Sequence, residues 1–192
     1  QWKSGKELVA FAKEKGYTHV ELHPVMEFLE DGSDGYPTSA YFAVSTRYGT
    51  PVEFAALVDE LHQVGIGVIL DWLPAQFPRY AGGLEKFDGT ALYEYPNMAV
   101  GRNEWGSCNF MHSRGEVCSF LQSSAYYWMN EFHFDGLRMD AVGNLIYWQG
   151  DASRGENLAA LKFIRTMNQG LKERIPDCLL FAEDSTPYQG VT

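Results

Sequence analysis

The sequence is poor in the features that mark several large classes of protein. It has three cysteines, Cys108, Cys118 and Cys178, an odd number without the spacing of a metal site. We therefore expect reduced thiols, as in a cytoplasmic protein. No apolar run approaches the ~18–20 residues that a membrane span needs. No signal peptide is visible in the opening QWKSGKELVAF, so any targeting signal would lie upstream of it.

Basic residues are also scarce. The chain has 15 Lys and Arg against 25 Asp and Glu, a formal net charge of −10, and no block of like charges. A nucleic-acid partner would need a basic patch, so we expect none. No Gly-rich phosphate loop follows any expected strand, and we predict neither a metal nor a cofactor. Aromatic residues make up 15% of the chain, and those that are not needed for the core would suit the flat apolar faces of sugar rings.

The apolar pattern alternates between helices and strands. Apolar residues at helical spacing predict helices around Leu8–Ala12, after Thr50, and over 117–128 and 158–175. The stretch TPVE at 50–53 reads as a capping box with proline at the first helical position. Strands are expected at 17–25, 67–74, 132–140 and 178–184, and the near-continuous apolar run GVILDWLP predicts a strand buried on both faces.

This alternation predicts an α/β fold with a parallel sheet and helices outside it. An open doubly wound sheet and a (β/α)8 TIM barrel both fit. Barrels place their chemistry at the carboxyl ends of the strands, where this chain carries Asp71, Asp140 and Glu183. A complete barrel has eight strands and about 250 residues. We therefore interpret 1–192 as one incomplete barrel domain, with long βα loops at 28–49 and 74–116 and no second domain.

The stretch EFHFDGLRMDAV places a charged pair, Arg138 and Asp140, at the end of an apolar strand. Residues i and i+2 of a strand point to the same face, so the guanidinium is expected beside the carboxylate, where it would lower the pKa of Asp140. Glu183 ends the next strand, and a glutamate that is partly buried near another carboxylate can serve as an acid. Two such carboxyls about 5–5.5 Å apart are the machinery of a retaining glycosidase. A structural Arg–Asp pair with a helix-capping glutamate fits the spacing equally well.

The exact residues of the strand-end motifs favour the retaining-glycosidase interpretation. The segments VILDWLP, FDGLRMD and LLFAED, in this order, resemble three strand-end motifs of the α-amylase-type glycoside hydrolase family. Within it, FDGTALYEYP, WGSCNF, IYWQGDASRGEN and AEDST are similar to bacterial glycogen branching enzymes. The resemblance runs along nearly the whole chain and implies a partial (β/α)8 barrel from about strand two to strand five.

The resemblance also implies roles for individual residues. Asp140 matches the nucleophile that forms a glycosyl-enzyme intermediate, Glu183 the general acid/base, and Arg138 the arginine that orients and ionises the nucleophile. Asp71 matches the aspartate that shapes the site around this arginine. Tyr36, in GSDGYP, matches a tyrosine that stacks on the sugar bearing the reacting carbon.

The chain departs from the family pattern at several of these positions. Gln76 stands where the family usually has a histidine that contacts the sugar, and an amide can donate a hydrogen bond but cannot become cationic. Asp34 replaces an aromatic residue and Pro37 an amide. The chain also ends before the His-Asp pair that carries the family's third catalytic carboxylate.

Other polar and aromatic residues are open to two interpretations. His23 could lie in the barrel interior, although we expect a packed, neutral histidine. Glu21 could join an internal polar network or the floor of the site. Trp148 and Tyr147 could form a glucan platform or pin their loop to the body. We expect a structural role for His112, near a helix start. Asp88 and Glu94 are expected to order their loop, with a sugar contact as the alternative.

The implied substrate is an α-1,4-glucan such as glycogen or amylose. The implied reaction cleaves an α-1,4 bond with retention and transfers the chain to a 6-hydroxyl, which forms an α-1,6 branch. An α-glucan hydrolase and a degenerate glucan-binding homologue are the alternatives. Residues 1–192 on their own are expected to be inactive, because the third carboxylate is missing.

Overall fold

Four parallel strands form the centre of the computed structural model, which describes residues 2–191. They are β1 (His19–Leu22), β4 (Gly67–Trp72), β7 (Gly136–Met139) and β8 (Leu179–Ala182). Their order in the sheet is β1-β4-β7-β8, the same as their order along the chain. A doubly wound sheet reverses its strand order at a switch point, whereas a barrel does not. The topology is therefore that of part of a (β/α)8 barrel, as the sequence predicts.

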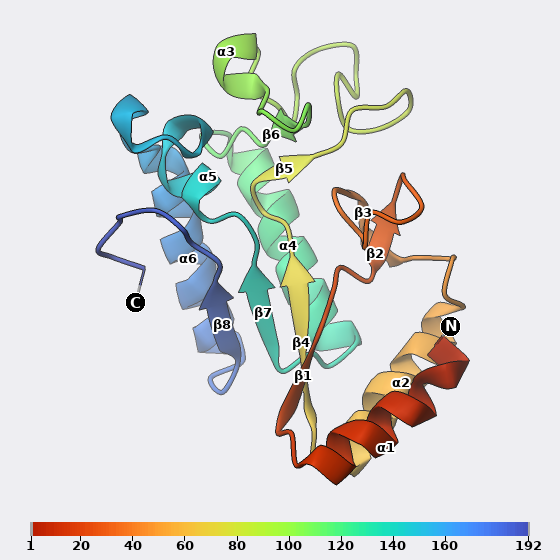
Figure 1. Ribbon diagram of the computed structural model, residues 1–192. Coiled ribbons are helices and arrows are strands. Elements are labelled where there is room, and N and C mark those ends of the chain that lie inside the picture. Colours follow the sequence, from red (N-terminus) through yellow and green to blue (C-terminus); the bar gives the residue numbers. More distant parts are fainter. Residues whose placement is uncertain (1, 192) are drawn as a thin grey trace.

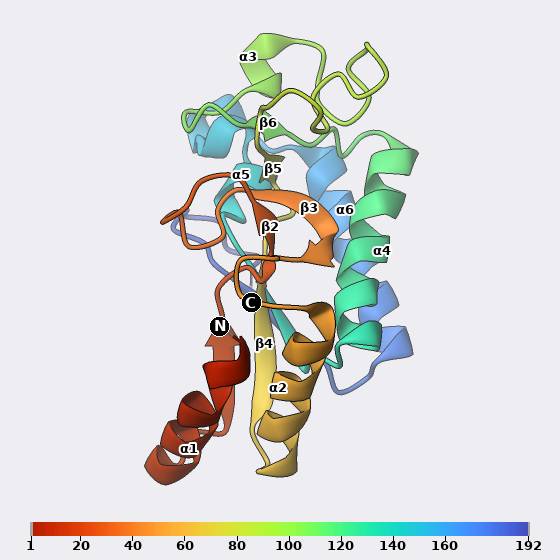
Figure 2. The ribbon, with the colours of Figure 1, turned by 90° about the vertical axis from the view of Figure 1, so that its right-hand side faces the viewer.

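A helix lies in each crossover between successive strands of the sheet. These helices are α2 (Pro51–Gln63), α4 (Gly115–Glu131) and α6 (Leu158–Arg174), and α1 (Gly5–Lys15) precedes the first strand. The predicted capping box is present in α2, where Glu53 N–H donates to the Thr50 hydroxyl and Thr50 N–H donates to the Glu53 carboxylate. Figures 1 and 2 both show α4 and α6 side by side on one side of the sheet.

The two middle strands are the most deeply buried. Val68, Leu70, Trp72 and Leu137 have no exposed surface, and helices α2 and α4 supply apolar partners such as Leu61. The predicted burial of the 67–74 run is therefore confirmed. The outer strands β1 and β8 are only partly covered, and the Phe181 side chain is 44% exposed.

The two long insertions contain secondary structure that the sequence pattern does not reveal. The 28–49 segment contains β3 (Thr38–Val44), which pairs antiparallel with β2 (Met26–Phe28) at the start of the segment. The 74–116 segment contains β5 (Gln76–Phe77), which pairs with β6 (Cys108–Asn109), and the short helix α3 (Met98–Gly101). Another short helix, α5 (Gly143–Ile146), follows β7. In Figure 1, β5, β6, α3 and α5 lie beyond the arrowheads of the strands, where the carboxyl-bearing residues are expected.

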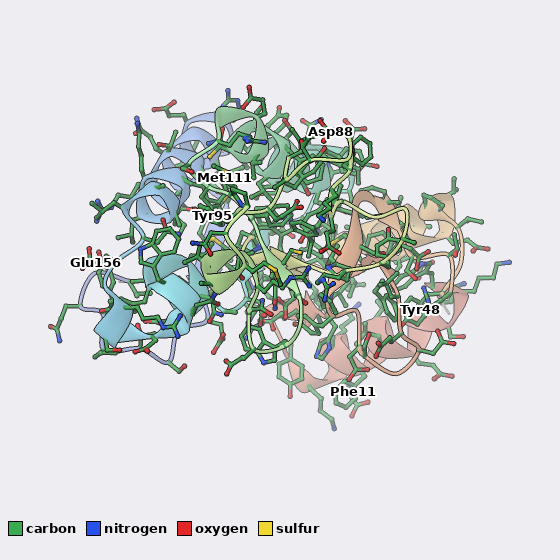
Figure 3. All side chains as sticks on the ribbon, turned by 90° about the horizontal axis from the view of Figure 1, so that it is seen from above. Phe11, Tyr48, Asp88, Tyr95, Met111 and Glu156 are labelled. Atoms are coloured by element: carbon green, nitrogen blue, oxygen red, sulfur yellow. The ribbon has the colours of Figure 1, made fainter. Side chains whose placement is uncertain are left out.

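Three short 3₁₀ segments complete the structure: η1 (Trp2–Ser4), η2 (Trp148–Gly150) and η3 (Ala152–Arg154). Seen from above, Phe11 and Tyr48 lie on the side of the N-terminal elements, and Tyr95 and Glu156 lie on the opposite side (Figure 3). The three cysteines are free thiols. Over residues 2–191, no helix is both long and apolar enough to cross a membrane.

Candidate active site

A cavity of about 870 Å³ opens at the carboxyl ends of the strands. Asp71 lies near the end of β4, Asp140 directly follows β7, and Glu183 directly follows β8. All three side chains line the cavity, because parallel strands in register end at one edge of the sheet. Arg138, Tyr36 and Gln76 also line it. The structure thus brings together every site residue that the sequence predicts.

Arg138 is the electrostatic centre of this group. Its Nη1 donates to Asp71 Oδ2 at 2.7 Å and to Asp140 Oδ1 at 2.9 Å. Arg138 and Asp140 share a face of the β7 extension, as the i, i+2 spacing predicts, and Asp71 pairs with Arg138 in the register of β4 and β7. Asp71 Oδ2 also accepts a hydrogen bond from the Tyr36 hydroxyl. One guanidinium therefore links two carboxylates, and Tyr36 is fixed through one of them.

Arg138 acts to lower the pKa of Asp140, as the sequence predicts, but the net pKa is raised rather than lowered. Burial raises the pKa of Asp140 above its ordinary value, and the hydrogen bond and charge of Arg138 oppose the increase without cancelling it. Glu183 contributes a further increase by repulsion, which is consistent with two neighbouring carboxylates. The pKa of Asp71 is raised as well, mainly by burial, although Tyr36 and Arg138 act against the shift. Desolvation is therefore the larger effect at both aspartates.

Glu183 is held by the turn that follows β7. The Ala141 N–H donates to Glu183 Oε2 at 3.0 Å, and the Val142 N–H donates to the Glu183 carbonyl at 3.0 Å. Ala141 has a φ of 52°, in the left-handed region that residues with a side chain rarely occupy. This backbone turn directs one N–H of the segment after Asp140 toward the carboxylate of the neighbouring strand. The two acids are thus positioned by one piece of backbone.

Two further predictions about cavity residues have different outcomes. His23 lines the cavity and lies edge-on to Tyr36, with ring centroids 6.0 Å apart, but it is exposed. The expectation of a packed histidine is therefore wrong, because the partly covered edge strand β1 does not enclose it. Glu21 also lines the cavity, with Oε1 3.9 Å from Arg138 Nε. This position agrees with the active-site-floor interpretation.

The remaining aromatic and acidic residues support the protein structure. Trp148 packs edge-on against Tyr95 at 5.4 Å, and Tyr147 against Tyr188 at 6.1 Å, so both pin their loop. Neither residue lines the cavity. Asp88 accepts hydrogen bonds from the N–H and hydroxyl of Thr90.

Two buried polar residues have the structural roles that the sequence predicts. Glu94 is buried and accepts a hydrogen bond from the Lys86 N–H. His112 is 5% exposed and lies 2.9 Å from the Pro74 carbonyl, to which its Nε2–H donates. Burial lowers the pKa of His112 to about 4, so this histidine is neutral in the native protein.

Sequence reasoning missed several polar residues at the rim of the cavity. Glu104, Trp105, Asn144 and Gln149 line it, and Asn103 hydrogen-bonds to the lining residue Gln76. These residues come from the loops after β4 and β7. The stretch GRNEWG, with three polar residues before an exposed tryptophan, is the local signal for them, and it does not show which side chains face inward.

The carboxyls of Asp140 and Glu183 line the same cavity, and the Arg138 guanidinium lies between Asp71 and Asp140. An ionised carboxylate can attack an electrophilic carbon, and a second carboxyl can donate a proton to the leaving oxygen. Among residues 2–191 there is no cluster of three or more side chains of the metal-binding types. The two carboxyls are suited by their own chemistry to acid-assisted nucleophilic displacement.

Comparison with known proteins finds one family match and several similar curated proteins. The family described as "Alpha amylase, catalytic domain" matches residues 7–76. The 1,4-alpha-glucan branching enzyme GlgB of Fusobacterium nucleatum is 48% identical over 185 residues, which cover 96% of this chain and 30% of that protein. GlgB of Mycobacterium tuberculosis is 46% identical over 97% of this chain and 27% of that protein. The chain thus spans less than a third of the length of these curated relatives.

Solved structures agree on the fold. The α-amylase of Geobacillus thermoleovorans, determined in complex with acarbose, superimposes with a TM-score of 0.78 at 21% identity and covers 97% of this chain and 41% of that one. A putative α-amylase of Salmonella typhimurium superimposes with a TM-score of 0.71 at 23% identity, over 95% of this chain and 28% of that one. The interpretation as part of a (β/α)8 barrel is therefore confirmed.

Proposed function

The chain is a homologue of the 1,4-α-glucan branching enzymes and belongs with them to the α-amylase-type family, and we propose that it carries two catalytic carboxyls of such an enzyme. Asp140 is the nucleophile, Glu183 the general acid/base, and Arg138 the residue that orients Asp140. The substrate is an α-1,4-glucan. The described residues form one incomplete barrel domain, so the activity belongs to a protein that supplies the remaining strands.

The proposed reaction has two steps. The Asp140 carboxylate attacks the anomeric carbon of a glucose unit while Glu183 protonates the departing 4-oxygen, so the α-1,4 bond breaks and a glycosyl ester forms. Glu183, now ionised, then removes the proton from a 6-hydroxyl of an acceptor chain. That oxygen attacks the anomeric carbon and releases Asp140, which leaves an α-1,6 branch with retained configuration.

One observation carries this proposal. Asp140 and Glu183 end neighbouring parallel strands, line the same cavity, and are linked through the Ala141 N–H, while Arg138 contacts Asp140 at 2.9 Å. A purely structural Arg–Asp pair would not require a second carboxyl to be held in the same cavity. The raised pKa of Asp140 is compatible with a nucleophile, provided that the enzyme works above the range in which this carboxyl is protonated.

Water competes with the 6-hydroxyl as acceptor, which makes an α-glucan hydrolase the second candidate. The 45–48% identity to branching enzymes over nearly the whole chain favours transfer, and it includes the long loop after β4 that forms part of the cavity rim. The binding-only alternative is motivated by Gln76, Asp34 and Pro37, which differ from the family pattern. Binding alone does not require Asp140 and Glu183 to lie in the same cavity.

The test uses the complete gene product that contains this chain, incubated with amylose. Branching predicts new α-1,6 linkages, detected with a debranching enzyme, without a matching increase in reducing ends. Hydrolysis would instead produce one new reducing end for each bond cleaved. If neither product forms but amylose still binds, the binding-only interpretation is correct.

A further inference from the structure

Four carboxamide side chains form a continuous hydrogen-bonded series from the cavity to the loop after β7. Asn103 Nδ2 donates to Gln76 Oε1 and, at 3.2 Å, to Asn109 Oδ1. Asn109 Nδ2 donates to Gln149 Oε1 at 3.2 Å. Gln76 and Asn109 lie directly opposite each other on β5 and β6, and Gln149 belongs to η2. We call these residues, Gln76, Asn103, Asn109 and Gln149, the amide series.

The backbone fixes the direction of the amide series at its centre. The Ser107 N–H donates to Asn103 Oδ1 at 3.0 Å, and a backbone N–H can only donate. The oxygen of Asn103 must therefore face Ser107, and its NH₂ group must face Gln76 and Asn109. Both of those side chains then have to present their oxygens to Asn103, because an NH₂ group cannot accept a hydrogen bond.

The far end imposes the same direction independently. Gln149 Nε2 donates to the carbonyls of Ala99 at 2.9 Å and Arg102 at 2.5 Å, and carbonyls can only accept. Its oxygen is thus left for Asn109, whose NH₂ group also donates to the Val100 carbonyl at 2.9 Å. Two sets of backbone groups therefore agree on the orientation of every amide in the series.

At the cavity end, this direction leaves the NH₂ group of Gln76 available. The Gln76 side chain is only 8% exposed, its oxygen is occupied by Asn103, and within residues 2–191 its Nε2 has no hydrogen-bond partner. The residue lines the cavity that contains Asp140 and Glu183. The Nε2 atom is not one of the buried polar atoms without a partner, so it is reached from the cavity, where water or a ligand can accept its hydrogen bond.

We propose that the amide series holds Gln76 as a fixed, uncharged donor toward an oxygen of the bound glucan, and that Asn103 is the positioning residue that sets its orientation. This inference rests on the proposed function, which supplies the glucan. The contact has no titrating group, because an amide neither gains nor loses a proton in the physiological range. It also connects the loop after β4 with the loop after β7, so that substrate binding depends on both loops.

A double-mutant cycle on glucan binding tests the proposal. The dissociation constant of maltoheptaose is measured by calorimetry for the complete gene product and for Gln76→Leu, Asn103→Ala and the double variant. Asn130→Ala, an exposed amide on α4, is the control, and thermal unfolding verifies that each variant is folded. Asn103→Asp is the second variant, because it keeps an acceptor for the Ser107 N–H but has no donor for Gln76.

We expect Gln76→Leu to weaken binding by about tenfold, the scale of one net hydrogen bond. Asn103→Ala and Asn103→Asp should weaken it several-fold in the native background and by less than about twofold in the Gln76→Leu background, because Asn103 acts through Gln76. Additive losses, or no loss in Gln76→Leu, would overturn the inference while leaving the proposed function intact. If the unaltered protein does not bind maltoheptaose, the proposed function fails, and the inferred glucan contact fails with it.

Discussion

His112 should make the stability of the protein depend on pH in a way that a single substitution removes. The pKa of His112 is lowered to about 4 by burial, against an ordinary value of 6.5. The unfolded chain therefore binds a proton near pH 6.5, whereas the folded chain does not until about pH 4. Because the unfolded state binds more protons in this window, the free energy of unfolding falls as the pH decreases through it.

The magnitude follows from the size of the shift. One pKa unit corresponds to 1.36 kcal/mol, so this residue should remove roughly 2 kcal/mol of stability by pH 5 and about 3 kcal/mol by pH 4. The variant His112→Gln does not titrate but can still donate to the Pro74 carbonyl, which lies 2.9 Å from His112 Nε2. It should therefore be less stable than the unaltered protein at pH 7 by a margin that shrinks, or changes sign, at pH 5.

Urea-induced unfolding at pH 7, 6 and 5 provides the measurement. The difference between the two proteins cancels the contributions of all other titrating groups, since these are unchanged. A difference in the free energy of unfolding that stays constant across this pH range would refute the reasoning, because it would show that His112 titrates equally in both states.

Three further predictions concern the strands and the carboxyls. Gly136→Ala should destabilise the protein by about 1–3 kcal/mol in denaturant unfolding, because the new Cβ would lie 2.7 Å from the Leu179 carbonyl oxygen, whereas Gly115→Ala, with no atom within 4 Å, should cost nothing. Arg138→Met should move the acidic limb of the pH profile of kcat/KM to higher pH, because Arg138 opposes the raised pKa of Asp140; an unchanged limb would mean that Asp140 does not control it. Glu183→Gln should lower activity on amylose by about 10²–10⁴-fold while cleavage of a glycosyl fluoride, whose leaving group needs little protonation, suffers much less. Equal losses on both substrates would argue against an acid role.

Periodic and local patterns explain why so much of the barrel could be predicted from the sequence. The buried run at 67–72 and the capping box at Thr50 depend on neighbours within a few residues, and both are confirmed. The gathering of Asp71, Asp140 and Glu183 followed from one rule, that parallel strands end at a common edge. The roles proposed for them come from the resemblance of the strand-end motifs.

The features that sequence reasoning missed depend on contacts between distant segments. The amide series joins residues from the loop after β4 to Gln149, which lies 40 residues beyond Asn109, and no periodicity marks such a set. The pKa of Asp140 was misjudged because the attraction of Arg138 is visible in the sequence, whereas burial is not. His23 was misplaced because the exposure of an outer strand depends on what covers it.

The most direct test of the central claim is to trap the glycosyl ester on the protein. The complete gene product is treated with a fluorinated glucosyl fluoride that forms the ester faster than it is released, then digested and analysed by mass spectrometry. We predict one added sugar on the peptide that contains Asp140, and no label in Asp140→Asn. A sugar attached to another residue, or an active enzyme that never acquires the label, would contradict the assignment of Asp140 as the nucleophile.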